Sequence, residues 1–321
     1  MYSKKSTINS EVDKMNVLSL FDGISCGMVA LERAGIHVDK YIAYEIDKFA
    51  IQTSEKNYPH IVRRGNVFDG SFSDFCGVDL LIGGSPCTYW SIAKKDRETT
   101  CDGEGFRLFM QYVRALEETG ARYFLYENNH SIHQNIKDEI SKRLGVQPIM
   151  INSALVSAQQ RKRCYWTNIP GVAQPADKGI LLKDIIDNAV PWQGKSYCLT
   201  ANYDGASFYD SMKRHKRTMV AEPVRIGDIG SDAREHRVYS VHGKSVSICA
   251  SGGGQGAVTG LYKIDLPDGD YLIRKLSPVE CERLQTLPDN YTAGVSNRQR
   301  YRQLGNGWTV DVIAHILGGV A

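Results

Sequence analysis

Cys87 and Glu127, two residues of types that can do covalent and acid–base chemistry, each come after a short apolar run. Cys87 follows Pro86 and the run 78–82, and Glu127 follows the run 123–126 and precedes two asparagines. A lone cysteine is more often a small buried side chain, and such a glutamate is often a neighbour of a helix N-cap. If both runs are strands of one parallel sheet, a nucleophile and an acid meet at its carboxyl edge.

A second group of residues, around the run 16–21, has the types that bind small molecules. Gly23 and Gly27 would let the backbone approach a ligand at a helix N-terminus. Phe21 could stack on a purine, and Glu45 could accept hydrogen bonds from a ribose diol. The spacing is not G-x-G-x-x-G, so the dinucleotide fingerprint is absent. From these residues alone, a glycine turn beside a surface glutamate is an equally good interpretation.

The elements that must position these residues alternate between strand and helix patterns, which indicates an α/β fold. We expect a mostly parallel sheet with helices on both faces. Asp47 is a predicted N-cap, and Ser277 with Glu280 forms a predicted capping box. The predicted strands are 16–21, 41–44, 62–67, 78–82, 123–126, 148–155 and 164–168, and the predicted helices include 26–34, 47–57, 106–119, 132–144 and 310–317.

The pattern changes in residues 185–270, which lack long helical periodicity and carry glycine-rich stretches and short β-like pieces. We expect a smaller, loop-rich β domain there. It would be inserted into the sheet domain, which comprises residues 15–184 and 271–321. Residues 1–14 are polar and charged, and we expect them to form a disordered tail.

The composition restricts the class of protein. The chain has 321 residues, a formal net charge of +3 and 42% hydrophobic residues, which excludes a largely disordered chain. It has no apolar run near the ~18 residues of a membrane span and no secretory apolar region, so we expect a soluble, cytoplasmic protein. The eight cysteines form no CxxC pair, and His130 and His133 lack nearby carboxylates or thiols, so we expect no metal site.

Several motifs occur together in one order, although each is weak alone. They are Phe21-Asp22-Gly23, Glu45, Ser85-Pro86-Cys87, Glu127-Asn128, Gln159-x-Arg161-x-Arg163, Arg274 through Asp289, and Gly305-Asn306. Together they resemble the S-adenosylmethionine-dependent DNA cytosine-5 methyltransferases over residues 15–321. The resemblance implies a Rossmann-like, class I methyltransferase fold. Ser85 departs from the family's common proline doublet, and Asn66 stands where an acidic residue is common.

The resemblance also implies roles in catalysis. Cys87 would be the nucleophile that adds to C6 of cytosine and thereby makes C5 able to attack the methyl group. Glu127 would contact N3 and the exocyclic amine, and its protonated form would stabilise charge that develops on the ring. Arg163 would contact O2 of the base, and Arg161 would support Glu127 and its loop.

The implied cofactor is S-adenosyl-L-methionine, and the implied product is S-adenosyl-L-homocysteine. Asn66 weakens one expected bond, because an amide replaces the acid that would bond to the adenine amine. The positions that match cofactor contacts are Phe21, Asp22, Gly23, Ile24, Glu45, Ile46, Asn66, Val67, Pro86 and Asn306.

Double-stranded DNA is the implied substrate, and the target base must leave the helix to be reached. Residues 88–105 would close over the flipped base, and residues 185–270 would recognise the target sequence. Arg237 would read a guanine, and Arg234 would fill the gap that the base leaves. The expected DNA-contacting positions are Thr88, Ser91, Arg225, Arg234, Arg237, Gly252, Gly253 and Gly254.

Two other functions stay open at this point. An RNA (tRNA) cytosine-5 methyltransferase of the same fold usually carries a Cys-Phe-Thr segment, which this sequence lacks. A catalytically inactive DNA-binding regulator would have lost the nucleophile or the acid, and both are present. We expect a monomer without a membrane partner, in a prokaryote or encoded by a phage. A cognate restriction endonuclease is a further candidate partner.

Overall fold

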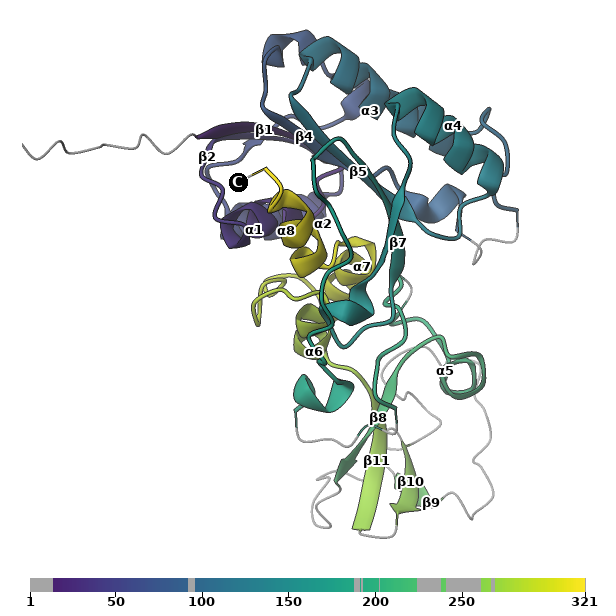
Figure 1. The fold of residues 1–321 in the computed structure, drawn as a ribbon. Helices are drawn as coiled ribbons and strands as arrows, with labels where there is room; N and C mark the ends of the chain where they lie inside the picture. The colour runs from purple at the N-terminus through teal and green to yellow at the C-terminus, as the bar shows by residue number, and fades with distance from the viewer. Residues whose placement is uncertain are drawn as a thin grey trace, which may run out of the picture.

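One sheet of seven strands forms the centre of the molecule (Figure 1). The computed structural model describes residues 14–91, 96–187, 191, 193–201, 203–223, 238–240, 261–266 and 269–320. The strand order is β3-β2-β1-β4-β5-β7-β6, and all neighbours are parallel except that β7 is antiparallel to β5 and β6. The strands are β1 (Met15–Leu20), β2 (Val38–Tyr44), β3 (Val62–Arg63), β4 (Leu80–Gly83), β5 (Tyr123–Asn129), β6 (Ile149–Asn152) and β7 (Lys162–Thr167).

Helices cover both faces of this sheet. Side chains alternate along each strand, so apolar residues in succession place apolar side chains on both faces. Val17 of β1 packs on the face of α1 and α8, whereas Leu18 and Leu20 pack on the face of α3 and α4 (Figure 1). The helices are α1 (Cys26–Arg33), α2 (Lys48–Asn57), α3 (Glu104–Thr119), α4 (Gln134–Leu144), α5 (Phe208–Arg214), α6 (Pro278–Leu284), α7 (Asn297–Asn306) and α8 (Val310–Leu317). The predicted α/β fold with a mostly parallel sheet is confirmed.

Two of the predicted strands are shorter in the structure. The predicted strand 62–67 is only two residues long, and 148–155 forms a strand only in its first half. At both places an asparagine, Asn66 or Asn152, accepts a hydrogen bond from the backbone N–H two residues later and begins a 3-10 turn. The 3-10 helices are η1 (Val67–Asp69), η2 (Phe72–Phe75), η3 (Cys87–Tyr89), η4 (Ser153–Leu155) and η5 (Leu182–Asp184).

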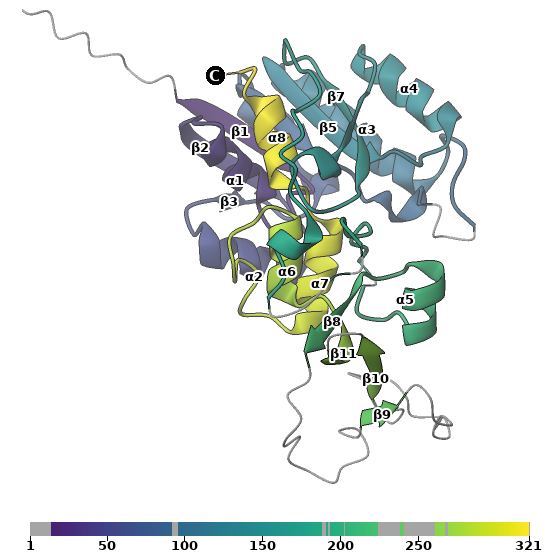
Figure 2. The same cartoon turned by 60° about the horizontal axis from the view of Figure 1, so that its bottom comes forward.

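A second, smaller sheet lies at one end of the molecule, beyond α6 and α7 (Figure 2). It contains β8 (Met219–Pro223), β9 (Val238–Ser240), β10 (Leu261–Leu266) and β11 (Gly269–Lys275), in the order β8-β11-β10-β9. The expected domain boundaries stay a prediction. So does the N-terminal tail, of which only Lys14 is described. In the described part of the chain, every helix is too short or too polar to cross a membrane.

The chain returns to the main sheet through α6, which begins with the predicted capping box. Ser277 Oγ accepts a hydrogen bond from the Glu280 N–H (3.2 Å), and Glu280 Oε2 accepts one from the Ser277 N–H (2.6 Å). The buried Glu280 carboxylate also pairs with Arg274 (2.8 Å) and accepts from the Asp187 N–H (3.0 Å). The cap therefore joins β11 and the segment after η5 to α6.

We predict that Ser277→Ala lowers the free energy of unfolding by about 1 kcal/mol, because the Glu280 N–H loses its acceptor. Urea unfolding followed by circular dichroism measures this change. The control is Ser73→Ala, which removes an exposed hydroxyl in η2 and should change stability by less than about 0.5 kcal/mol. Equal stabilities for the two variants would show that the cap has no role.

Candidate active site

The turn after β1 is held by the carboxylate of Glu45, which follows β2. Its Oε2 accepts a hydrogen bond from the Gly23 N–H (2.8 Å), and its Oε1 accepts from the N–H groups of Ile46 and Asp47 (both 2.8 Å). Gly23 has a φ of 61°, in the region that favours glycine. Because a carboxylate can accept about four hydrogen bonds, Glu45 keeps one acceptor position for a ligand.

The neighbouring carboxylate, Asp22, is held by hydroxyl groups of the protein. It accepts hydrogen bonds from Ser19 (2.6 Å), Ser25 (2.6 Å) and Tyr41 (2.7 Å). Asp22 therefore fixes the turn, and the turn lines the cavity described below.

Gly27, at the start of α1, was predicted to let the backbone approach a ligand, but the structure gives it a role in packing. A Cβ there would lie 2.4 Å from the Ile82 side chain and 2.7 Å from the Tyr41 hydroxyl. The missing side chain thus lets α1 pack closely on the sheet. Gly27 does not line the cavity to which Gly23 contributes.

A cavity of about 500 Å³ opens at the carboxyl ends of β1, β2, β4 and β5. Its volume is within the usual range of small-molecule sites. Two apolar side chains at its edge, Ile46 and Phe68, are 72% and 37% exposed. All the residues predicted to contact a cofactor or to act in catalysis line it: Phe21, Asp22, Gly23, Ile24, Glu45, Ile46, Asn66, Val67, Pro86, Asn306, Cys87, Glu127, Arg161 and Arg163.

The loop that carries Cys87 is tied to β5. Asn128 Nδ2 donates to the Ser85 carbonyl oxygen (3.1 Å), and the hydroxyls of Ser85 and Tyr126 are 2.7 Å apart. The Ser85 hydroxyl, which replaces the proline common in the resembled family, thus takes part in a buried network. The loop can hold the thiol at a fixed position relative to β5.

The half-buried thiol of Cys87 begins η3 at the cavity wall. Burial raises the pKa of this thiol, the charges of Arg163 and Arg161 lower it, and Glu127 raises it, with a net shift upward. The thiol is therefore protonated at neutral pH before a substrate arrives. Its attack on a base requires loss of that proton.

The segment after the nucleophile, 88–105, is anchored at both ends. Trp90 is fully buried, and its Nε1 donates to Glu98 (3.2 Å). The Glu98 carboxylate accepts from the Gly105 N–H (3.1 Å) at the start of α3. Residues 92–95 lie outside the described residues, and closure of this segment over a base stays a prediction.

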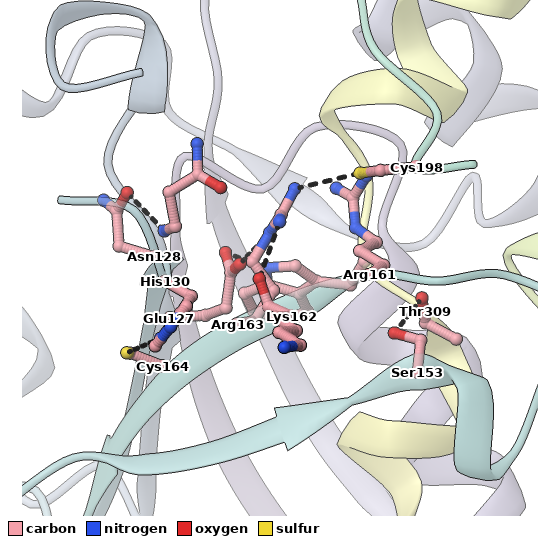
Figure 3. A network of polar contacts seen from close by, with 12 residues as sticks. Glu127, Asn128, His130, Ser153, Arg161, Lys162, Arg163, Cys164, Cys198 and Thr309 are labelled. Atoms are coloured by element: carbon pink, nitrogen blue, oxygen red, sulfur yellow. Dashed lines mark hydrogen bonds and ion pairs between the residues drawn. The ribbon is translucent and has the colours of Figure 1, made fainter. Parts of the chain in front are cut away.

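Both carboxylate oxygens of Glu127 have fixed donors. Oε1 lies 3.0 Å from Arg163 Nε (Figure 3), and Oε2 accepts a hydrogen bond from Trp308 Nε1 (3.0 Å). Trp308 was not among the residues predicted from the sequence. Its position two residues after the motif Gly305-Asn306 was the only hint in the sequence. Its contact with Glu127 joins residues 181 positions apart, and no local sequence pattern predicts such a contact.

Arg161 supports this arrangement indirectly. Its guanidinium donates to the carbonyl oxygens of Leu199 (3.0 Å), Gly305 (3.1 Å) and Gly307 (2.9 Å). Trp308 directly follows Gly307, so Arg161 fixes the segment that carries the partner of Glu127. Cys198, near both arginines in Figure 3, was also missed.

The expected DNA-contacting residues are only partly covered by the structure. Thr88 lines the cavity. Ser91 does not, and its N–H donates to the Cys87 carbonyl oxygen (2.9 Å). The others lie outside the described residues: Arg225, Arg234, Arg237, Gly252, Gly253 and Gly254. Over the described ranges, no cluster of three or more His, Cys, Asp or Glu side chains is arranged to hold a metal ion.

Comparisons with known proteins give relatives over almost the whole chain. The Type II methyltransferase M.HhaI of Haemophilus parahaemolyticus is 24% identical over 326 residues, with 96% of this chain and 94% of that protein covered. The orphan methyltransferase M.SPRI of Bacillus phage SPR is 23% identical, with 94% and 96% covered. The structure of the methyltransferase EhMeth from Entamoeba histolytica has the same fold, with a TM-score of 0.67, 15% identity and 96% and 98% covered.

The family comparison is more specific than these pairwise likenesses. A family model for C-5 cytosine-specific DNA methylases matches residues 15–320, which include the sheet, the cavity and the C-terminal helices. The order of motifs in the sequence indicates the same family. The chain belongs to the C-5 cytosine-specific DNA methylases.

Proposed function

We propose that this protein takes a target cytosine out of duplex DNA and methylates C5 through a covalent adduct between Cys87 and C6. One observation carries the proposal. A single cavity is lined by Cys87, Glu127, Arg163 and every position expected to contact the cofactor. Transfer between two bound molecules needs both to be held in reacting orientation, and a shared cavity provides this.

The cavity suits S-adenosyl-L-methionine. The exposed apolar side chains of Ile46 and Phe68, together with Phe21, offer surfaces for a purine. Glu45 keeps one acceptor position that a ribose hydroxyl could use. When bound, the cofactor supplies a methyl group on a positively charged sulfur, and S-adenosyl-L-homocysteine is the product.

The protein's own groups would carry the addition step. As the Cys87 thiol loses its proton, an S–C6 bond forms and the electron pair of the C5=C6 bond moves to C5. Glu127 would contact N3 and the exocyclic amine, and Arg163 would contact O2, so both stabilise charge on the ring. After C5 takes the methyl group, it loses its proton, the C5=C6 bond re-forms, and the S–C6 bond breaks to release the thiolate.

The biological setting is proposed from the named relatives. M.HhaI comes from a bacterium and M.SPRI from a bacteriophage, which supports a cytoplasmic enzyme of a prokaryote or phage. One relative is named a Type II methyltransferase and the other an orphan methyltransferase. This protein would therefore act either with a cognate restriction endonuclease or without one. Residues 185–270 would recognise the target sequence.

We predict that Cys87→Ser abolishes methyl transfer, because a hydroxyl is a much weaker nucleophile than a thiolate. Binding of S-adenosyl-L-homocysteine, measured by calorimetry, should persist in this variant. The control is Cys76→Ser, which changes an exposed thiol outside the cavity and should keep wild-type turnover. Comparable turnover in Cys87→Ser and wild type would remove Cys87 from the nucleophile role.

We predict that Trp308→Phe lowers kcat about tenfold, because the ring remains but the N–H donor to the Glu127 carboxylate is lost. The control is Trp166→Phe, which removes a buried N–H···O bond to Ser141 (2.9 Å) away from the cavity. That control should lower the melting temperature with little change in kcat. If both variants lose kcat only in proportion to stability, Trp308 does not position Glu127.

The substrate class is tested by transfer of a radiolabelled methyl group to mixed-sequence duplex DNA and, separately, to tRNA. We expect incorporation into DNA, with the product identified as 5-methylcytosine after digestion to nucleosides. Greater incorporation into tRNA would favour the RNA methyltransferase. No incorporation into any DNA, with cofactor binding intact, would favour the inactive regulator.

A further inference from the structure

Two buried cations lie side by side at the wall of the active-site cavity. Arg161 and Arg163 are 3% and 9% exposed, and both line the cavity. A buried cation is costly unless an anion or a fixed set of acceptors compensates it. Glu127 pairs with Arg163 through Nε. The described hydrogen bonds of the Arg161 guanidinium go to three carbonyl oxygens and to one sulfur atom.

That sulfur belongs to Cys198, which contacts both arginines (Figure 3). Its Sγ lies 3.5 Å from Arg161 Nη1 and 4.0 Å from Arg163 Nη2. The neutral thiol would gain one contact, donation to the Leu199 carbonyl oxygen at 3.4 Å. The thiolate, in contrast, would be stabilised by the positive charge of two guanidinium groups, so the surroundings favour the thiolate over the thiol.

The segment around Cys198 is fixed, so the sulfur cannot easily move away from the arginines. The Leu199 N–H donates to Gln159 Oε1 (2.9 Å), and its carbonyl oxygen accepts from Arg161. The next residue packs tightly on α7, since a Cβ on Gly305 would lie 2.2 Å from the carbonyl carbon of Thr200. The contact between sulfur and guanidinium groups is thus built into the fold.

We propose that Cys198 is a positioning residue that acts as a thiolate: it balances the charge of Arg161 and Arg163 and holds Arg163 toward the cytosine. The assignment to catalysis rests on the proposed function above. Burial raises the pKa of Cys198, but the two arginines lower it more, so its pKa lies below the ordinary value. Cys87, which lines the cavity, shows the opposite net shift.

The ionisation of Cys198 can be measured without any activity. The ultraviolet absorbance of the thiolate is titrated with pH in Cys87→Ser and in Cys87→Ser with Cys198→Ser, and the difference belongs to Cys198. The internal reference is exposed Cys76, obtained in the same way with Cys76→Ser. We expect a midpoint for Cys198 below that of Cys76 and below the pH of the activity assay. A midpoint above the assay pH, or one not below that of Cys76, would overturn the proposal, whether or not the enzyme transfers methyl groups.

The positioning role is tested by kinetics in the otherwise wild-type protein. Cys198→Ser keeps the size but removes the charge, and should lower kcat about tenfold with KM for S-adenosylmethionine little changed. Cys198→Asp restores a negative charge beside the same arginines and should recover part of the loss. A role in packing alone predicts the reverse order, with Ser near wild type and Asp worse. That order would contradict the proposal, and Cys76→Ser is the control for loss of a thiol elsewhere.

Discussion

The buried guanidinium of Arg161 makes the contact on which the rest of the site depends. It enters from the start of β7 and bonds to carbonyl oxygens that lie 38, 144 and 146 residues later in the chain. Closing such long loops costs entropy, and burying a cation costs solvation. Several fixed acceptors around one rigid, planar donor offset both costs. The same contact brings the C-terminal segment with Trp308 back to the sheet domain.

The place of the cavity follows from the strand order. From β1 the chain adds β2 and β3 on one side of the sheet and β4 and β5 on the other. The connections therefore diverge between β1 and β4, and a crevice forms beyond their carboxyl ends. Carboxylates and glycines at those ends shape one side, and the return of the chain through α7 and the residues directly after it closes the other. Cofactor and nucleophile positions share the cavity because they use adjacent strands of one edge.

Local patterns and the family resemblance were sufficient for the sheet, the caps and most of the lining of the cavity. Cys87 and Glu127 could be paired because Cys87 follows β4 and Glu127 lies near the carboxyl end of β5, and these ends meet at one edge of the sheet. Contacts between distant segments could not be predicted, and these include Trp308 with Glu127 and Cys198 with the arginines. Asn66 was predicted to lie in a strand because a pattern of apolar residues carries no information about its side chain, which accepts a hydrogen bond from the backbone two residues later.

The reversed direction of β7 makes the site sensitive to the length of one connection. Asn129 pairs with Arg163 across the antiparallel ladder, and Glu127 pairs with Tyr165. Successive side chains of a strand face opposite sides, so a slip of one residue would exchange the two faces. Cys164, now buried on the face of α3 and α4, would replace Arg163 at the cavity. Insertions or deletions of one residue before β7 should therefore be far less tolerated than substitutions there.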